Sequence, residues 1–150
     1  MIATIRPDAW NLALLLHVLG AMLLVGTVVL AGSALLLAWR AGTASLVRLG
    51  YRSLLLGVLP GWVLMRVGAE WITSKEDLTD ANLSWLDVGF MTADAGLAVI
   101  VLATVLAGLA ARRAARADRS VATGRAAAIL VSLLSIAYLV AIWAMTTKPT

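Results

Sequence analysis

Cysteine is absent from this sequence, which excludes disulfide bonds, thiolate metal sites, cysteine nucleophiles and the C-x-x-C-H attachment of haem. Charge is scarce as well, since only 13% of the 150 residues are charged while 62% are hydrophobic. Soluble domains of this size are usually about half apolar and about a quarter charged. We therefore expect a chain that is solvated by the lipid bilayer and forms a single transmembrane domain over residues 1–150.

The short motifs that mark common enzymes and nucleic-acid-binding proteins are also missing. There is no H-E-x-x-H, no G-x-S-x-G, no P-loop and no glycine-rich dinucleotide turn between a strand and a helix. No block of basic residues with interleaved aromatic residues indicates a nucleic-acid partner. Ser135, His17 and Asp94 make a nominal triad, but nothing in the sequence orders them. Enzyme activity is left uncertain, and the sequence favours a protein that is not an enzyme.

Long apolar runs are what the sequence does contain. Four of them reach the roughly 20 helical residues that cross a bilayer. The predicted spans cover residues 10–39, 51–72, 85–111 and 126–146. Five of the six tryptophans fall near the ends of these runs, as in the aromatic belt of membrane proteins. The expected fold is therefore all-α, a four-helix transmembrane bundle.

Arginines are distributed unevenly over the predicted connections. Eight of them follow the first and third spans, namely Arg40, Arg48, Arg52, Arg112, Arg113, Arg116, Arg119 and Arg125. The opposite side has only Arg6, Lys75 and Lys148. By the positive-inside rule the arginine-rich side is cytoplasmic, so both termini lie on the non-cytoplasmic side of what we expect to be a bacterial inner membrane. Binding of anionic lipid headgroups or of a partner is a second use of these arginines.

A few ionisable or polar residues lie inside the predicted spans, where charge is costly. With a rise of about 1.5 Å per residue, His17, Asp94 and Tyr138 lie about 12 to 14 Å below the outer surface. Arg66 lies about 10 Å deep, and Glu70 is one turn closer to the surface. The four spans therefore each contribute to one polar layer. Arg66 is expected to pair with Glu70 on its own helix and with Asp94 on the next.

Two interpretations of this polar layer stay open. In the first, it is a buried ion network that fixes the register of the helices, with His17 and Tyr138 hydrogen-bonded into it. In the second, it lines a cavity that binds a proton, a metal ion, a quinone, haem or another small ligand. Haem would need a methionine or the His17 of a second copy as its other axial ligand. Copper or zinc would use His17 and Asp94 with a methionine, and the identity of any cofactor is left unknown.

Small residues are frequent in the spans, and Gly57-x-x-x-Gly61 has the spacing that lets two helix backbones approach closely. The pattern predicts tight packing, either within the chain or between copies. Pro60 lies beside it and removes one helical hydrogen bond, so a kink is expected in the second span.

The first span, LALLLHVLGAMLLVGTVVLAG, and the closing stretch AIWAMTTKP resemble uncharacterised four-helix proteins of bacterial inner membranes. The HVLG stretch that begins at His17 is also distantly similar to the copper-resistance D membrane proteins. That resemblance covers the whole length in topology and the first span in motif. The resemblance to the copper-resistance D proteins implies copper handling at the outer face. Of that family's pattern, only His17 carries over to this sequence.

These features together predict a non-enzymatic integral membrane protein. We expect an accessory or oligomer-forming subunit, as a homo-oligomer or within a larger membrane complex. The alternative is a membrane protein that binds a small ligand, copper, haem or quinone through His17, Arg66, Glu70, Asp94 and Tyr138.

Overall fold

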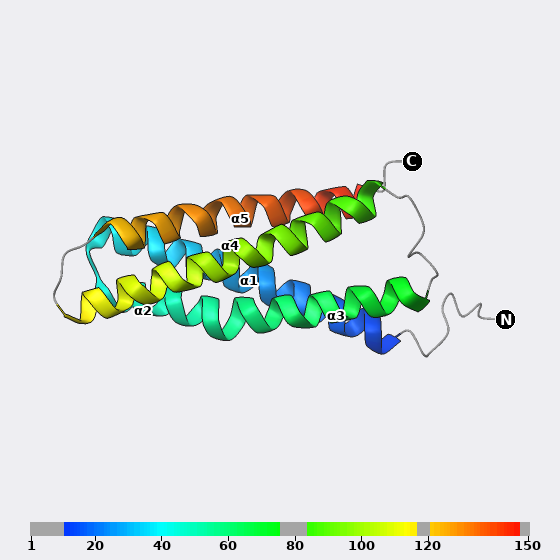
Figure 1. Ribbon diagram of the computed structural model, residues 1–150, viewed down its shortest axis with the longest axis horizontal. Helices are drawn as coiled ribbons and strands as arrows, with labels where there is room; N and C mark the ends of the chain where they lie inside the picture. The colour runs from blue at the N-terminus through cyan, green and yellow to red at the C-terminus, as the bar shows by residue number, and fades with distance from the viewer. Residues whose placement is uncertain (1–10, 76–83, 117–120, 148–150) are drawn as a thin grey trace.

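Helices make up nearly all of the chain that the computed structural model describes, which is residues 11–75, 84–116 and 121–147. In chain order they are α1 (Asn11–Ala41), α2 (Ala44–Ser53), the π-helical segment η2 (Leu54–Val58), α3 (Leu59–Lys75), α4 (Ser84–Ala115) and α5 (Val121–Thr147). No strand occurs in these described ranges. Because α2, η2 and α3 run on without a break, there are four helical runs, each long and apolar enough to cross a membrane (Figure 1). The predicted all-α, four-helix transmembrane bundle is confirmed.

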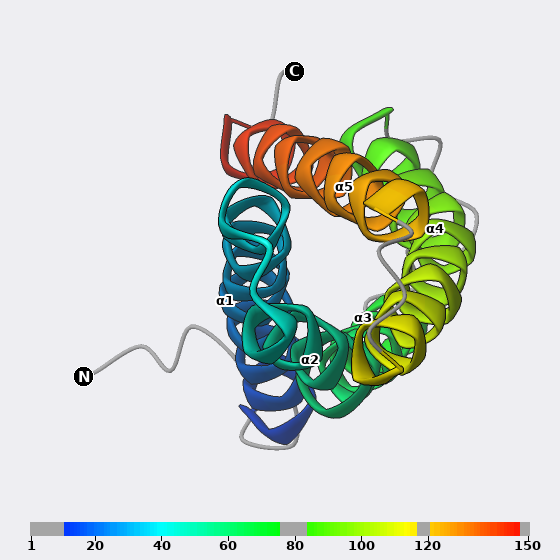
Figure 2. The same ribbon diagram turned by 90° about the vertical axis from the view of Figure 1, so that its left-hand side faces the viewer.

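The two ends of the bundle differ in charge. At one end α1 turns into α2 and α4 leads towards α5, and most of the arginines lie there; we call it the arginine end. At the other end lie the start of α1, the end of α3, the start of α4 and the end of α5. We call this the acidic end, because the carboxylates of the described residues all lie in that half: Glu70, Asp87 and Asp94. Viewed from the arginine end, the helices stand in the order α1, α2–α3, α4, α5 (Figure 2).

The second helical run begins earlier than the sequence suggested, at Ala44 rather than near Tyr51. Gly42 makes the turn possible, because its φ of 65° lies in the left-handed region that glycine adopts without strain. The helix from Ala44 is stable there because it is amphipathic. Val47 and Tyr51 pack against the core, whereas its arginines stay exposed.

The second run contains a π-helical turn just before Pro60, and the kink expected at Pro60 stays a prediction. The residues before it, Leu54–Val58, form η2, and the backbone N–H of Leu59 donates to the carbonyl of Leu54, five residues back. Proline has no N–H to offer the carbonyl four residues before it. A wider turn is one of the ways in which a helix adjusts to such a break.

Glycines bring α1 and α3 into backbone contact. A Cβ atom added at Gly61 would lie 2.7 Å from the backbone nitrogen of Leu24, and one added at Gly20 would overlap the backbone of Met65. At Gly57 the added atom would lie 2.5 Å from the Thr27 side chain. The Gly57-x-x-x-Gly61 pattern is therefore used within the chain, where it packs α3 and η2 onto α1.

The apolar core lies in the middle of the bundle and towards the arginine end. Its larger buried side chains come from α1, η2, α4 and α5: Leu24, Val28, Leu35, Leu54, Val58, Ile100, Val131 and Leu134. Within α3, all of which the structure describes, the buried residues are only Gly61 and Gly68. In the acidic half, α1 packs on α3 and α4 packs on α5, but α3 and α4 touch very little. The two helix pairs therefore diverge towards the acidic end (Figure 1).

Exposed tryptophans lie near the helix ends, as the aromatic belt requires. Trp39, Trp71 and Trp143 all expose their rings. Trp10 and the side chain of Trp85 lie outside the described part of the chain. The three visible rings fit the expected positions of the two membrane–water interfaces.

Candidate functional site

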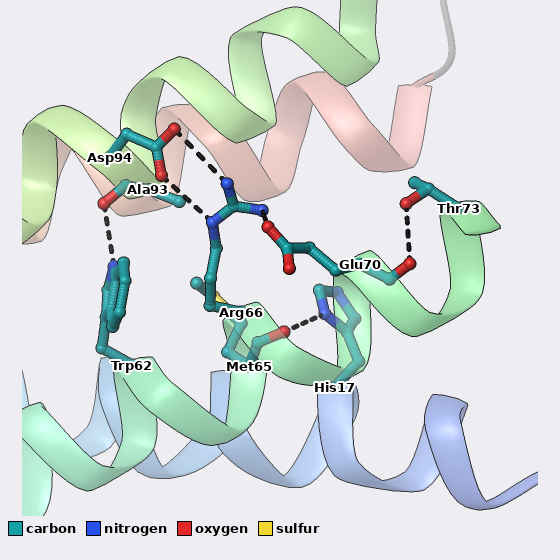
Figure 3. Close-up of polar contacts among 8 residues, drawn as sticks. All are labelled: His17, Trp62, Met65, Arg66, Glu70, Thr73, Ala93 and Asp94. Atoms are coloured by element: carbon teal, nitrogen blue, oxygen red, sulfur yellow. Dashed lines mark hydrogen bonds and ion pairs between the residues drawn. The ribbon is translucent and has the colours of Figure 1, made fainter. Parts of the chain in front are cut away.

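Arg66 of α3 joins the two diverging helix pairs (Figure 3). Its Nε atom donates a hydrogen bond of 3.0 Å to Oδ1 of Asp94 on α4, and Nη2 lies 3.5 Å from Oδ2. Its Nη1 atom lies 2.9 Å from Oε1 of Glu70, one turn along α3. One guanidinium thus holds a carboxylate from its own helix and another from the neighbouring helix, as the spacing of these residues led us to expect.

The ion cluster is unevenly buried. The Arg66 side chain is only 19% exposed, whereas Glu70 is 63% exposed and Asp94 is 58% exposed. The ring of Phe90 covers the guanidinium, with its centroid 4.5 Å from Cζ, which adds a cation–π contact. The arginine is therefore enclosed within the protein, and the two carboxylates face out of it.

The Arg66 guanidinium does not use all of its donors well. Nη1 is close enough to Glu70 for an ion pair, but it is buried and makes no hydrogen bond of good geometry to any described residue. Because a guanidinium carries five N–H groups, this leaves hydrogen-bonding capacity at the centre of the cluster. Counted in formal charges the cluster is −1, since one arginine faces two carboxylates.

Trp62 makes a second connection between α3 and α4. Its indole Nε1–H donates a hydrogen bond of 2.8 Å to the backbone carbonyl of Ala93 (Figure 3). Trp62 lies one turn before Arg66 on α3, and Ala93 is next to Asp94 on α4. We call the contacts of Trp62 and Arg66 with Ala93, Asp94 and Phe90 the α3–α4 bridge.

The predicted site did not include Trp62, Ala93 or Phe90, and of these Phe90 is the one whose ring covers the Arg66 guanidinium. Phe90 lies four residues before Asp94, so both side chains lie on the same side of α4. The same spacing separates Trp62 from Arg66. An aromatic residue one turn from each ion-pair partner is the signal in the sequence that points to this arrangement.

His17 lies beside the bridge but does not join its ion pairs. Its Nδ1 atom is 3.0 Å from the backbone carbonyl of Met65 on α3 (Figure 3). A carbonyl can only accept, so Nδ1 carries the hydrogen and a neutral ring keeps its lone pair on Nε2. Among the described residues, no group of three or more histidine, aspartate and glutamate side chains is placed to hold a metal ion. The metal site of His17 and Asp94 stays a prediction.

Tyr138 of α5 lies apart from the bridge, in the interface between α4 and α5. Its side chain is 5% exposed, and its hydroxyl has no hydrogen-bond partner among the described residues. A Cβ atom added at Gly96 of α4 would lie 2.6 Å from this hydroxyl. Gly96 is two residues from Asp94, about 200° around the helix, so Tyr138 packs on the side of α4 that faces away from Asp94.

The structure therefore divides the expected layer into three parts. Arg66, Glu70 and Asp94 come together, His17 binds the backbone of α3, and Tyr138 is enclosed against Gly96. A binding role for any of these residues stays a prediction.

Comparisons of the chain with protein-family models, with curated proteins and with solved structures found no match. The similarity of the HVLG stretch to copper-resistance D proteins therefore stays an expectation carried by one span. The described residues form four helices that are long and apolar enough to cross a membrane, which is compatible with an integral membrane protein. The geometry of the α3–α4 bridge is therefore the basis for a proposal about its function.

Proposed function

We propose that this chain is a non-enzymatic membrane protein that acts as an accessory or oligomer-forming subunit, and that a partner transmembrane helix packs on the α3–α4 bridge. The observation that carries the proposal is the exposure of Asp94 and Glu70, each more than half exposed within a membrane-spanning helix. Asp94 lies ten residues into α4, about 15 Å from the start of that helix. A carboxylate at that depth is costly unless protein or water covers it.

The surroundings of the bridge favour protein as the cover. Val63 and Val67 of α3 and Met91 of α4 are exposed around the polar centre. A polar group surrounded by apolar side chains is the usual composition of helix–helix contacts in membranes, where interhelical hydrogen bonds add to packing. The partner is expected to present a donor or a cation to Asp94 and Glu70, since the cluster has a surplus of negative charge.

We further propose a location in a bacterial inner membrane, with the arginine end in the cytoplasm and both termini on the other side. The exposed arginines gathered at one end support this orientation. The absence of cysteine allows a direct test with single-cysteine variants. A membrane-impermeant maleimide added to intact cells should label Lys75→Cys and leave Thr43→Cys unlabelled, and the reverse pattern would contradict the orientation.

The assembly proposal is tested by native mass spectrometry of the protein, gently extracted from its own membranes. The expected result is a defined oligomer, or the chain travelling with another membrane polypeptide. Glu70→Gln with Asp94→Asn should reduce the complex to the monomer, because the carboxylates no longer attract the partner. Asp87→Asn is the matched control, because Asp87 is an exposed acid of α4 outside the bridge and its change should leave the complex intact. A monomeric parent protein, or an unchanged complex in the double variant, would contradict the proposal.

A second candidate function is the binding of a small ligand, a metal such as copper, or a haem or quinone at the same layer. The observation in its favour is His17, whose Nδ1 lies 3.0 Å from the Met65 carbonyl, which leaves Nε2 as the atom that can bind a metal when the ring is neutral. Histidines that bind metals usually donate their other ring N–H in this way. The same mass spectra distinguish the two candidates. A non-protein mass bound once per chain, and lost in His17→Ala, would support ligand binding.

A further inference from the structure

Three exposed arginines lie on the two helices that pack together at the arginine end, α2 and α4. Arg48 and Arg52 are one turn apart on α2, and Arg112 lies near the end of α4. We call these three residues the arginine column. Figure 1 and Figure 2 both show α2 beside the last turns of α4, and the two helices are in extensive contact.

The contact between Tyr51 and Gly108 sets the register of these two helices. A Cβ atom added at Gly108 would lie 3.0 Å from Cε2 of Tyr51. The helices are antiparallel, because α2 leads away from the arginine end and α4 leads towards it. Arg48 precedes Tyr51 by three residues and Arg112 follows Gly108 by four, so both lie about 5 Å nearer the arginine end. Arg52 lies one turn deeper in the membrane.

All three arginines lie on one side of the α2–α4 pair. On α2, Gly50 faces Leu35 of α1, and Tyr51 faces α4. Around the axis of α2, Arg48 lies about 60° and Arg52 about 100° from Tyr51. Both are on the side away from Gly50 and therefore away from α1. On the antiparallel α4, Arg112 is about 40° beyond Gly108 and turns towards the same side. The arginine column thus faces out of the bundle.

No carboxylate of the described residues lies near the column, because all of them lie in the acidic half. Arg125 differs, since its guanidinium lies 4.3 Å from the ring centre of Trp39 and makes a contact within the chain. The positive-inside rule requires only that arginines lie near the cytoplasmic ends of the spans. It does not require three of them on one side of one helix pair, so the column calls for a further explanation.

An apolar track continues from the column towards the middle of the membrane. Leu56 is exposed one turn beyond Arg52, although the π-helical turn shifts its direction. Val105 and Leu109 are exposed on α4, at about 60° and about 100° from Gly108, on the same side as Arg112. The surface therefore combines three cations at the interface with an apolar strip beneath them.

We infer that the arginine column and this apolar track bind one anionic phospholipid, whose phosphate contacts Arg48, Arg52 and Arg112 and whose acyl chains lie along Leu56, Val105 and Leu109. A guanidinium matches phosphate through parallel N–H···O bonds, and several together favour an anion over a zwitterion. The apolar track selects a lipid over free phosphate. This inference is independent of the partner proposed at the α3–α4 bridge.

The test is native mass spectrometry of the full chain in detergent, titrated with phosphatidylglycerol or with phosphatidylcholine. One phosphatidylglycerol should bind per chain, and phosphatidylcholine should bind about tenfold more weakly. Arg52→Gln and Arg112→Gln should each weaken phosphatidylglycerol binding about tenfold. Arg40→Gln is the matched control, because Arg40 is also exposed at the arginine end but lies on α1. It removes the same charge and should leave binding unchanged.

Three outcomes would overturn the inference. They are equal affinity for the two lipids, parental binding in both Arg52→Gln and Arg112→Gln, and an equal loss of binding in Arg40→Gln. The last would mean that net charge alone attracts the lipid. Competition by millimolar inorganic phosphate would indicate an anion site without a role for the acyl chains, and would also contradict it. Circular dichroism of each variant checks the helix content, and either arginine alone suffices for the test if one variant fails to fold.

Discussion

The two halves of this bundle are held together in different ways. In the half at the arginine end, side chains from α1, η2, α4 and α5 share one apolar core, which includes Leu35, Leu54 and Val131. In the acidic half there are two helix pairs, each packed through glycine, and α3 contributes no large buried side chain. The pairs are connected there by the α3–α4 bridge. One half is therefore closed by packing, and the other by a few polar contacts.

This difference has a physical meaning in a membrane. Lipid tails are as apolar as leucine, so helices associate through close packing and hydrogen bonds rather than through the hydrophobic effect. Close packing persists when conditions change, because the backbones fit one another. A bridge of ion pairs and one indole N–H depends on its surroundings. The acidic half is thus the part of the molecule where a partner or a ligand can change the structure at least cost.

The largest effect is expected from breaking the glycine packing of α1 on α3. Gly20→Ala places a Cβ atom against the backbone of Met65, which cannot move aside as a side chain can. We expect a loss of about 3 kcal/mol in the free energy of unfolding, measured by titration with a denaturing detergent. The matched control is Gly26→Ala on the same helix, where an added Cβ meets nothing within 4 Å and stability should not fall. Equal stability of the two variants would contradict the described packing.

A moderate effect is expected from breaking the bridge itself. Arg66→Leu should destabilise the protein by about 2 kcal/mol, less than for a fully buried pair because both carboxylates are more than half exposed. Adding Asp94→Asn should recover part of the loss, because Glu70, whose side chain is 63% exposed, is then the one carboxylate of the cluster left without its cation. Thermal unfolding of the two single variants and the double variant measures the coupling. Additive losses would show that Arg66 and Asp94 do not act as a pair.

The smallest effect is expected at Tyr138. Tyr138→Phe removes a buried hydroxyl that has no partner among the described residues, so stability should change by less than about 0.5 kcal/mol. Trp62→Phe, which removes the hydrogen bond to the Ala93 carbonyl, should cost about 1 kcal/mol in the same thermal assay. A larger loss at Tyr138 than at Trp62 would mean that its hydroxyl binds a water molecule or a ligand, and would favour the second candidate function.

The fold could be predicted from the sequence because long apolar runs leave few alternatives in lipid. The pairing of Arg66 with Asp94 was also predictable, since a charge at that depth needs a partner and few are available. The position of Tyr138 was not. Counting residues from a span end gives depth, but it does not say which side of the bundle a residue faces. Tyr138 has the right depth, yet it faces Gly96 on the other side of α4 from Asp94.

Two other features depended on information that the local sequence does not hold. Arg48 and Arg52 suggested a connecting loop, but α2 is helical there because Val47 and Tyr51 pack on the core while the arginines face outwards. The Gly57-x-x-x-Gly61 spacing predicted that another helix would pack closely against these glycines. It did not indicate whether that helix belonged to the same chain. In the structure, both glycines pack against α1.

The role of the bridge as a contact site is tested most directly by cysteine cross-linking in native membranes, because the chain has no cysteine of its own. Met91 is 73% exposed beside the bridge on α4, and Met22 is 71% exposed on α1. Membranes that contain Met91→Cys or Met22→Cys would be treated with a short bis-maleimide. We predict one product of defined mass for Met91→Cys, a dimer or a complex with another membrane polypeptide, and none for Met22→Cys. No product from Met91→Cys, or the same product from both variants, would contradict the proposal that a partner packs on the α3–α4 bridge.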